Sequence, residues 1–396
     1  MTDARNHRDQ CAIVGIGATE YSNRSGRSEL TLAVEACSRA VEDAGLKPRD
    51  IDGIIRSTDD VVLHNELAFA LGTPNLTYWG HSGTGGSAPC AMVGQAVAAI
   101  LAGEANNVLL YRSLNGRSGR RFGLSTAAAD EVGGRQRQAY DEFFVPYGLS
   151  VPGQMFAIIA RRHMIDFGTT RRQLGSIALA CRAAANRNPN AVMQAKTLSM
   201  DDYLAARPIA EPLCLLDFCL ETDGAAAVVV TRADRMQDGP SAGVLIRAVA
   251  QGTGQDVQLG RFLPSLMRPT ITSFPSRDVA RTLYARAGLG PADIDVAQIY
   301  DCFTISVLVQ LEDYGFCTPG EGGPFVESGS IDLDGALPIN TAGGHLSEAY
   351  LHGMNHILEG VRQMRGESTA QVAGAETCLV TGGVPTASAA IVLRRA

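Results

Sequence analysis

Two glycine-rich segments of the chain carry residues that could act on a substrate. The first spans residues 83–90 (GTGGSAPC), and the second spans residues 340–353 (NTAGGHLSEAYLHG). Glycine lets a backbone approach a ligand closely, and free N–H groups at a helix N-terminus stabilise a developing oxyanion. We expect each segment to lead into a helix, the second beginning near Tyr350. The residues expected to contact substrate are Gly86, Ser87, Gly343, Gly344, His345 and His352.

Cys90, at the end of the first segment, is a candidate nucleophile. Pro89 suits the first turn of a helix, so the thiol would lie near the positive end of the helix dipole, where the pKa of a cysteine falls. A buried cysteine that packs the helix is the alternative, and both interpretations stay open at this point. The segment is not a P-loop, because no Lys-Ser/Thr follows it, and its spacing does not match a dinucleotide fingerprint.

Histidines and a tyrosine form the other candidates. His345, His352 and His356 lie in or just after the second segment, but no carboxylate or cysteine completes a familiar spacing of metal ligands, so we expect no metal site. Tyr300 ends an apolar strand predicted over residues 296–300, the place where α/β sheets gather reactive groups. For an isolated tyrosine, a packed ring with a hydrogen-bonded hydroxyl is the alternative.

A repeated nine-residue segment indicates how these candidates are positioned. Residues 44–52 read AGLKPRDID and residues 287–295 read AGLGPADID, which agree at seven of nine positions. Each copy follows an amphipathic helical pattern, ends that helix at a glycine and leads into an apolar strand. A second helix and strand follow in each half, at residues 90–112 and 351–381. We therefore predict two similar α/β halves, 1–236 and 237–396, with sheets covered by helices.

The first half contains a long insertion. Residues 113 to about 207 are too many for a plain loop, so we interpret them as an inserted subdomain. Its segment 115–138 is rich in glycine and arginine, which fits either a solvated loop or a clamp for the phosphates of a substrate such as coenzyme A. The arginines are Arg117, Arg120, Arg121, Arg135 and Arg137.

The overall composition excludes several classes of partner. A net charge of −7 argues against nucleic acid, because affinity for phosphate backbones needs an excess of Lys and Arg. Residues 1–10 are polar, and no stretch reaches the roughly 18 apolar residues of a membrane span. Nine cysteines without CxxC pairs fit reduced thiols. We expect a cytoplasmic protein with no membrane span.

Motifs over nearly the whole chain together resemble the thiolase superfamily, in particular the sterol-carrier-protein-x-type thiolases. The matching segments are residues 98–104 (AAILAGE), 151–168, 216–217 (LD) with 223–226 (DGAA), 300–303 (YDCF) and 340–353. This resemblance implies a duplicated thiolase fold, an α/β protein with layers in the order αβαβα, that carries the inserted loop subdomain.

The chain departs from those thiolases at all three catalytic positions, which hold a cysteine and two histidines in the family. Counting back from Gly103 places the cysteine position on Gly86 or Ser87, so Cys90 lies about one 5.4 Å helical turn away. The histidine positions hold Tyr300 and Tyr350. Paired tyrosines with a lost cysteine resemble the lipid-transfer-protein-type aldolases of steroid side-chain degradation, which implies that both tyrosines are catalytic.

That resemblance implies a retro-aldol reaction on a β-hydroxyacyl-CoA, with a steroid or bile-acid side chain as the acyl group. The products would be a ketone or aldehyde and a shorter acyl-CoA, without a cofactor beyond the coenzyme A of the substrate. One tyrosine, as a stabilised anion, would take the hydroxyl proton, and the other would protonate the enolate. The resemblance also implies a homodimer and a companion subunit with an OB-fold and a zinc ribbon.

Two other functions stay open. A true thiolase, an acetyl-CoA acetyltransferase, would use Cys90 as its nucleophile and form an acyl-enzyme. A non-catalytic subunit would bind lipid or acyl-CoA without turnover, even with a companion protein present.

Overall fold

Strands and helices alternate along the chain. The computed structural model describes residues 7–83, 85–119, 121, 144–236, 242–255, 263–383 and 385–396. The strands are β1 (Cys11–Ala18), β2 (Gly53–Ser57), β3 (Tyr78–Ser82), β4 (Asn107–Asn115), β5 (Pro208–Ala210), β6 (Leu213–Cys214), β7 (Asp223–Arg232), β8 (Val244–Gly252), β9 (Val296–Gln298), β10 (Thr377–Gly382) and β11 (Ser388–Arg395). The helices are α1 (Glu29–Asp43), α2 (His64–Leu71), α3 (Ala88–Leu101), α5 (Pro152–Phe167), α6 (Arg171–Arg187), α7 (Met200–Ala205), α8 (Ser276–Ala287), α9 (Thr304–Asp313), α10 (Gly322–Glu327), α11 (Gly344–Ser347) and α12 (Met354–Arg365).

The described strands form a nine-stranded sheet and a small β5-β6 pair. The order in the large sheet is β3-β2-β4-β7-β1-β8-β11-β10-β9. Pairings repeat on its two sides: β2 is parallel to β4 as β9 is to β10, and β4 is antiparallel to β7 as β10 is to β11. The two sides meet through a short contact between β1 and β8. The predicted boundary between residues 236 and 237 adjoins residues 237–241, which lie outside the described chain, and it stays a prediction.

The repeated nine-residue segment has the same local structure in both halves. Gly45 and Gly288, which follow α1 and α8, both have a φ of 68°, in the left-handed region that glycine adopts without strain. The last residue of each copy is an aspartate that joins two parallel strands. Asp52 accepts hydrogen bonds from backbone N–H groups at the start of β4, and Asp295 accepts them at the start of β10.

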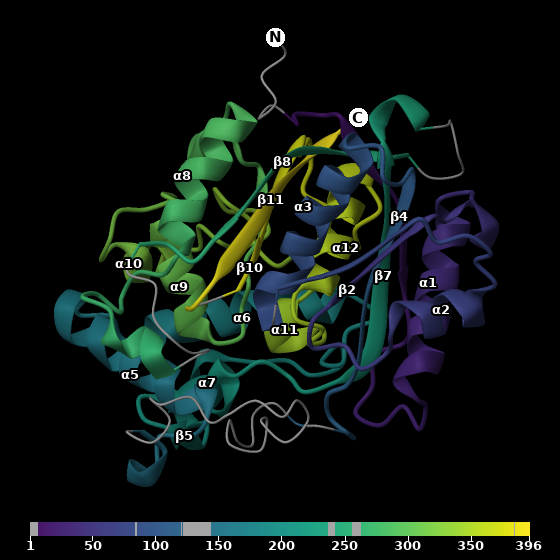
Figure 1. The fold of residues 1–396 in the computed structure, drawn as a ribbon. Helices are drawn as coiled ribbons and strands as arrows, with labels where there is room; N and C mark the ends of the chain where they lie inside the picture. Colours follow the sequence, from purple (N-terminus) through teal and green to yellow (C-terminus); the bar gives the residue numbers. More distant parts are fainter. Residues whose placement is uncertain are drawn as a thin grey trace.

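Helices cover the sheet on its outer faces and also lie between its two sides. In Figure 1, α1 and α2 flank the strands of the first half, α8 and α9 flank those of the second, and α3 and α12 lie in the centre. Helix α3 (APCAMVGQAVAAIL) is buried over most of its length, and so is α12, because strands pack against the central helices from both halves. The layers therefore follow the order αβαβα that the resemblance implied.

The insertion between β4 and β7 packs against the second half. Its described part contains α5, α6 and α7, and Phe156 of α5 stacks on Phe303 with ring centroids 4.3 Å apart. Helix α6 contacts α9, α10 and α11. Within the described chain, no helix combines the length and the apolar character that crossing a bilayer requires.

Candidate active site

Segments from both halves meet where the two central helices begin. Gly86 lies just before α3, and Gly353 lies just before α12. Tyr300 follows β9, at the carboxyl end of a strand, where α/β sheets gather ligands. A Cβ atom built on Gly353 would lie 3.5 Å from Cδ2 of Tyr300 and 3.9 Å from the carbonyl oxygen of Gly86. These three segments therefore form one site.

The second glycine-rich segment is not arranged as its sequence predicts. Instead of one helix beginning near Tyr350, the chain forms the short helix α11 (Gly344–Ser347), then a loop, then α12 from Met354. Gly353, with a φ of 97°, is the residue before α12, and its left-handed conformation prevents the helix from beginning at an earlier residue. The prediction of a helix start near Tyr350 was therefore wrong, and Tyr350 lies in a loop.

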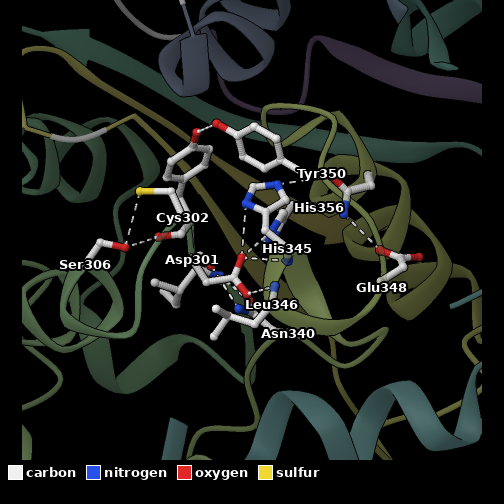
Figure 2. Close-up of polar contacts among 12 residues, drawn as sticks. Asp301, Cys302, Ser306, Asn340, His345, Leu346, Glu348, Tyr350 and His356 are labelled. Carbon is white, nitrogen blue, oxygen red and sulfur yellow. Dashed lines mark hydrogen bonds and ion pairs between the residues drawn. The ribbon is translucent and has the colours of Figure 1, made fainter. Parts of the chain in front are cut away.

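Tyr300 and Tyr350 face each other. Their hydroxyl oxygens are 3.0 Å apart, within hydrogen-bond distance (Figure 2). Both backbones are anchored: the N–H of Tyr300 donates to Oγ1 of Thr381 at 2.9 Å, and the N–H of Tyr350 donates to Oγ1 of Thr222 at 2.9 Å. Tyr300 is 3% exposed, whereas Tyr350 is partly exposed. The two backbone hydrogen bonds thus fix the pair in place, and Tyr350 is the more exposed of the two residues.

Both tyrosines resist ionisation. Burial raises the pKa of Tyr300 well above its usual value, and the nearby Tyr350 raises it further. Burial also raises the pKa of Tyr350 well above its usual value, although the hydrogen bond with Tyr300 and the charge of Arg112 oppose that rise. The doubly protonated pair therefore predominates at neutral pH.

Gly86 makes room for Tyr300. A Cβ atom built on Gly86 would lie 2.1 Å from Cζ and 2.4 Å from the hydroxyl oxygen of Tyr300. No side chain fits at that distance, so the tyrosine ring occupies the space that a side chain would fill on Gly86, one of the two residues predicted at the nucleophile position. Ser87, the next residue, is 7% exposed and precedes α3. The substrate contacts predicted for Gly86 and Ser87 stay predictions.

Cys90 lacks the properties expected of a nucleophile. It lies in the first turn of α3, as predicted, but it is 1% exposed and its thiol donates to the carbonyl oxygen of Val380 at 3.7 Å. Burial raises the pKa of Cys90 to about 12, opposite to the lowering expected from the helix dipole. Desolvation of the thiolate outweighs the dipole here, so Cys90 packs the helix.

Behind the tyrosines lies a buried group of one acid and two histidines. Atom Oδ1 of Asp301 lies 3.0 Å from Nε2 of His356 and 3.1 Å from Nδ1 of His345 (Figure 2). The ring of His345 contacts both Tyr300 and Tyr350 edge-to-face, with centroids 4.9 Å away in each case. This group supports both tyrosine rings.

Asp301 is held as a carboxylate. Burial alone would raise its pKa, but the charges and hydrogen bonds of His345 and His356 hold that pKa well below its usual range. Its two oxygens also accept the backbone N–H groups of His345 and Leu346 at 2.8 and 3.1 Å. The candidate metal-ligand atoms of Asp301, His345 and His356 lie within 4.8 Å of one another, a grouping that sequence spacing did not indicate. Because the carboxylate oxygens already accept these N–H donors, we interpret the group as structural support.

The paired glycines of the second segment approach protein groups. A Cβ atom on Gly344 would lie 2.3 Å from Oδ2 of Asp301, and one on Gly343 would lie 2.6 Å from Cβ of Ala185 in α6. Their small size therefore lets α11 pack against Asp301 and the insertion. His352, 4% exposed, packs its ring against that of Tyr350 with centroids 4.9 Å apart. Their predicted contacts with substrate are untested.

Two features of the site were not predicted from the sequence, and part of one predicted segment lies outside the described residues. Arg112 contacts His352 and is fully buried; the signal was a charged residue inside the apolar strand NVLLYRSLN. The second is Asp301, visible in the YDCF motif but without a predicted role. Of the arginine-rich segment, Arg120, Arg135 and Arg137 lie outside the described residues, whereas Arg121 pairs with Glu221 at 2.5 Å.

Two proteins whose names state an activity are similar in sequence to this chain over nearly its whole length. A protein of Mycobacterium tuberculosis named 17-hydroxy-3-oxo-4-pregnene-20-carboxyl-CoA lyase is 46% identical over 389 residues, 97% of this chain and 99% of that protein. A steroid side-chain-cleaving aldolase of Thermomonospora curvata is 42% identical over 383 residues, 96% of this chain and 97% of that protein. The family model described as thiolase C-terminal domain-like matches residues 264–395.

Solved structures of similar proteins have the same fold as this chain. A structure described as an Ltp2-ChsH2(DUF35) aldolase has a TM-score of 0.90 and 41% identity, covering 98% of this chain and 99% of that one. Human mitochondrial 3-ketoacyl-CoA thiolase has a TM-score of 0.68 at 13% identity, covering 98% of this chain and 99% of that one, which shows the fold alone. The expected duplicated thiolase fold is thereby confirmed.

Proposed function

This chain belongs to the steroid side-chain-cleaving aldolases of the thiolase superfamily, and we propose that it cleaves the side chain of a steroid β-hydroxyacyl-CoA. It is a carbon–carbon lyase. The observation that carries the mechanism is the 3.0 Å contact between the hydroxyls of Tyr300 and Tyr350, in a site where Gly86 brings no side chain and Cys90 is buried. Two proton carriers without a nucleophile suit a retro-aldol cleavage rather than acyl transfer.

The proposed cycle moves one proton through the pair. One tyrosine oxygen, having lost its proton, takes the proton of the substrate β-hydroxyl. The electrons of that O–H bond form the new C=O bond as the Cα–Cβ bond breaks, and its electron pair stays with Cα as a thioester enolate. The other tyrosine protonates Cα. A proton then crosses the 3.0 Å contact and restores the pair, so atoms and charge balance without a further cofactor.

Tyrosine-to-phenylalanine variants test this function, because they remove only the hydroxyl. We expect Tyr300→Phe and Tyr350→Phe each to lower kcat/KM for retro-aldol cleavage by about 10³-fold, within the range typical of a lost general acid or base. Tyr314→Phe is the matched control, since the hydroxyl of Tyr314 is buried with no partner among the described residues. Parent-like rates in both site variants, with unchanged unfolding, would rule the mechanism out.

The proposed assembly has two kinds of partner. One similar structure is described as an Ltp2-ChsH2(DUF35) aldolase, which supports a companion subunit. We propose that this companion has the OB-fold and zinc ribbon that the resemblance to the aldolases implies. We also propose a homodimer; β3 ends the described sheet, and exposed edge strands are common sites of pairing. Co-expression with such a companion, followed by a mass measurement in solution, tests both: a lone monomeric chain would contradict them.

We propose that the enzyme works in the cytoplasm. All nine cysteines are free in the structure, as expected of a protein kept in a reducing compartment. Fractionation of cells that make the protein tests this location.

A further inference from the structure

A buried arginine from the N-terminal half lies behind Tyr350. Arg112, in β4, is 0% exposed, and its Nη1 lies 2.6 Å from Oδ1 of Asp60. Its Nε and Nη2 lie 3.1 and 2.6 Å from Nδ1 of His352. A guanidinium offers only donors, so Nδ1 of His352 is the acceptor. The proton of this imidazole is therefore on Nε2, and the ring is neutral.

This contact holds a strained residue beside the site. His352 has a φ of 55°, a left-handed conformation that is strained for a non-glycine residue and persists only where the surroundings enforce it. Its ring packs edge-to-face on that of Tyr350, at 81°. Asp60 is itself held by the backbone N–H groups of Ser57 and Ser113, at 3.0 and 3.2 Å. Asp60, Arg112 and His352 thus form a continuous buried support for Tyr350.

The charged and titratable groups around the two tyrosines affect the two pKa values unequally. Burial raises the pKa of both, and so do the thiols of Cys219 and Cys302. For Tyr350, the hydrogen bond with Tyr300 and the Arg112 charge lower the pKa. For Tyr300, the contact with Tyr350 raises the pKa further. The groups that face Tyr350 among the described residues are Tyr300, His345, His352, Arg112, Cys219 and Cys302.

We propose that Arg112, held by Asp60, is a positioning residue that makes Tyr350 the tyrosine carrying negative charge in the reaction. Tyr350 then takes the β-hydroxyl proton, and Tyr300, which donates its hydrogen bond to the Tyr350 oxygen, protonates Cα of the enolate. A buried charge acts strongly on its neighbours because the protein interior screens it less than water does. This assignment rests on the proposed retro-aldol function.

The pH dependence of kcat/KM tests the assignment. Because burial raises the pKa of both tyrosines, the singly ionised pair is scarce at pH 7, and the parent kcat/KM should rise with pH through the neutral range. Arg112→Met removes the charge, so we expect at least a tenfold loss at pH 8 and a profile displaced to higher pH. Arg112→Lys keeps the charge and should restore most of the rate.

Asp60→Asn should displace the pH profile of kcat/KM in the opposite direction. Removing the carboxylate leaves the Arg112 charge less neutralised, so Tyr350 should ionise more readily and the profile should move to lower pH. A merely structural support predicts instead that Asp60→Asn and Arg112→Met lower kcat/KM alike at every pH. Arg162→Met, which removes an exposed arginine paired with Asp166, is the matched control and should leave the profile unchanged.

The outcomes separate the two proposals. If both Tyr→Phe variants are inactive but neither Arg112→Met nor Asp60→Asn displaces the profile, the role of Arg112 is wrong and the retro-aldol function stands. If the Phe variants keep parent rates, the function itself fails. Thermal unfolding of every variant is measured alongside; should Arg112→Met not fold, the direction of the Asp60→Asn displacement decides.

Discussion

The loop before α3 and the loop before α12 lie at the same place in the two halves, yet they carry opposite kinds of residue. Residues 83–87 (GTGGS) carry no tyrosine or histidine, and Gly86 leaves the space that the Tyr300 ring fills. Residues 344–353 (GHLSEAYLHG) bring Tyr350, His345 and His352. In this duplicated scaffold, one half therefore provides the catalytic side chains, and the other half provides the space that they occupy.

The buried carboxylates that follow β2 and β9 extend this contrast. Asp60, after β2, pairs with the guanidinium of Arg112, whose positive charge lowers the pKa of Tyr350. Asp301, after β9, contacts His345 and His356, which support the tyrosine rings. The N-terminal half thus supplies space and charge, whereas the C-terminal half supplies the proton carriers and their support.

A large loss of activity should come from filling the space that the N-terminal half provides. Gly86→Ala places a Cβ atom 2.1 Å from the Tyr300 ring, so the ring must move. Misplacing a reacting group by about 1 Å costs roughly 10²-fold in rate. We expect kcat/KM to fall at least that far.

Gly290→Ala in the other half is the control for that substitution. The only described neighbour of its added Cβ, within 4 Å, is Oδ2 of Asp293 at 3.8 Å, an ordinary contact. Activity within twofold of the parent for Gly86→Ala, with a folded protein, would break the comparison between the two loops.

A second effect, on stability and not on rate, should appear in the pH dependence of unfolding. Burial raises the pKa of Glu348, in the loop before α12, to about 7 from a usual 4.5. The folded chain therefore holds this proton between pH 4.5 and 7 while the unfolded chain loses it, so stability falls as pH rises through that window. Relative to the parent, Glu348→Gln should gain about 3 kcal/mol across it, at 1.36 kcal/mol per pKa unit.

Denaturant unfolding of both proteins at a series of pH values measures this difference. The amide of glutamine cannot ionise, but its oxygen can still accept from Asn355, which donates to Glu348 at 2.9 Å in the parent. A stability difference that is independent of pH would show that the C-terminal loop is not the pH-sensitive part of the site.

The smallest effect should be equal in the two halves. Asp52→Asn and Asp295→Asn each weaken hydrogen bonds to the backbone at the start of the next parallel strand. Each should lower the free energy of unfolding by about 1 kcal/mol, the usual contribution of such a bond, and leave kcat unchanged. Unequal losses, or a change in kcat for one variant alone, would show that the scaffold itself differs between the halves.

The repeat, the helix that follows Gly86 and the two tyrosines were all accessible from the sequence. Helices and strands follow from local apolar patterns and from glycine stops, which act over a few residues. The start of α12 was mispredicted because the left-handed conformations of His352 and Gly353 leave no clear signal in an apolar pattern. The reactivity of Cys90 was uncertain for a different reason: burial, which reversed the effect of the helix dipole, is a property of packing.

The sequence by itself determined the duplicated scaffold and the identity of the paired tyrosines, because both follow from motifs whose residues lie close together in the chain. Only the tertiary structure decided that their hydroxyls meet at 3.0 Å across 50 residues of chain. It alone joined Arg112 to His352, residues separated by 240 positions. Such contacts depend on how α3, α12 and the sheet pack in three dimensions, and that packing also fixes the burial and charge on which the proposed proton transfer depends.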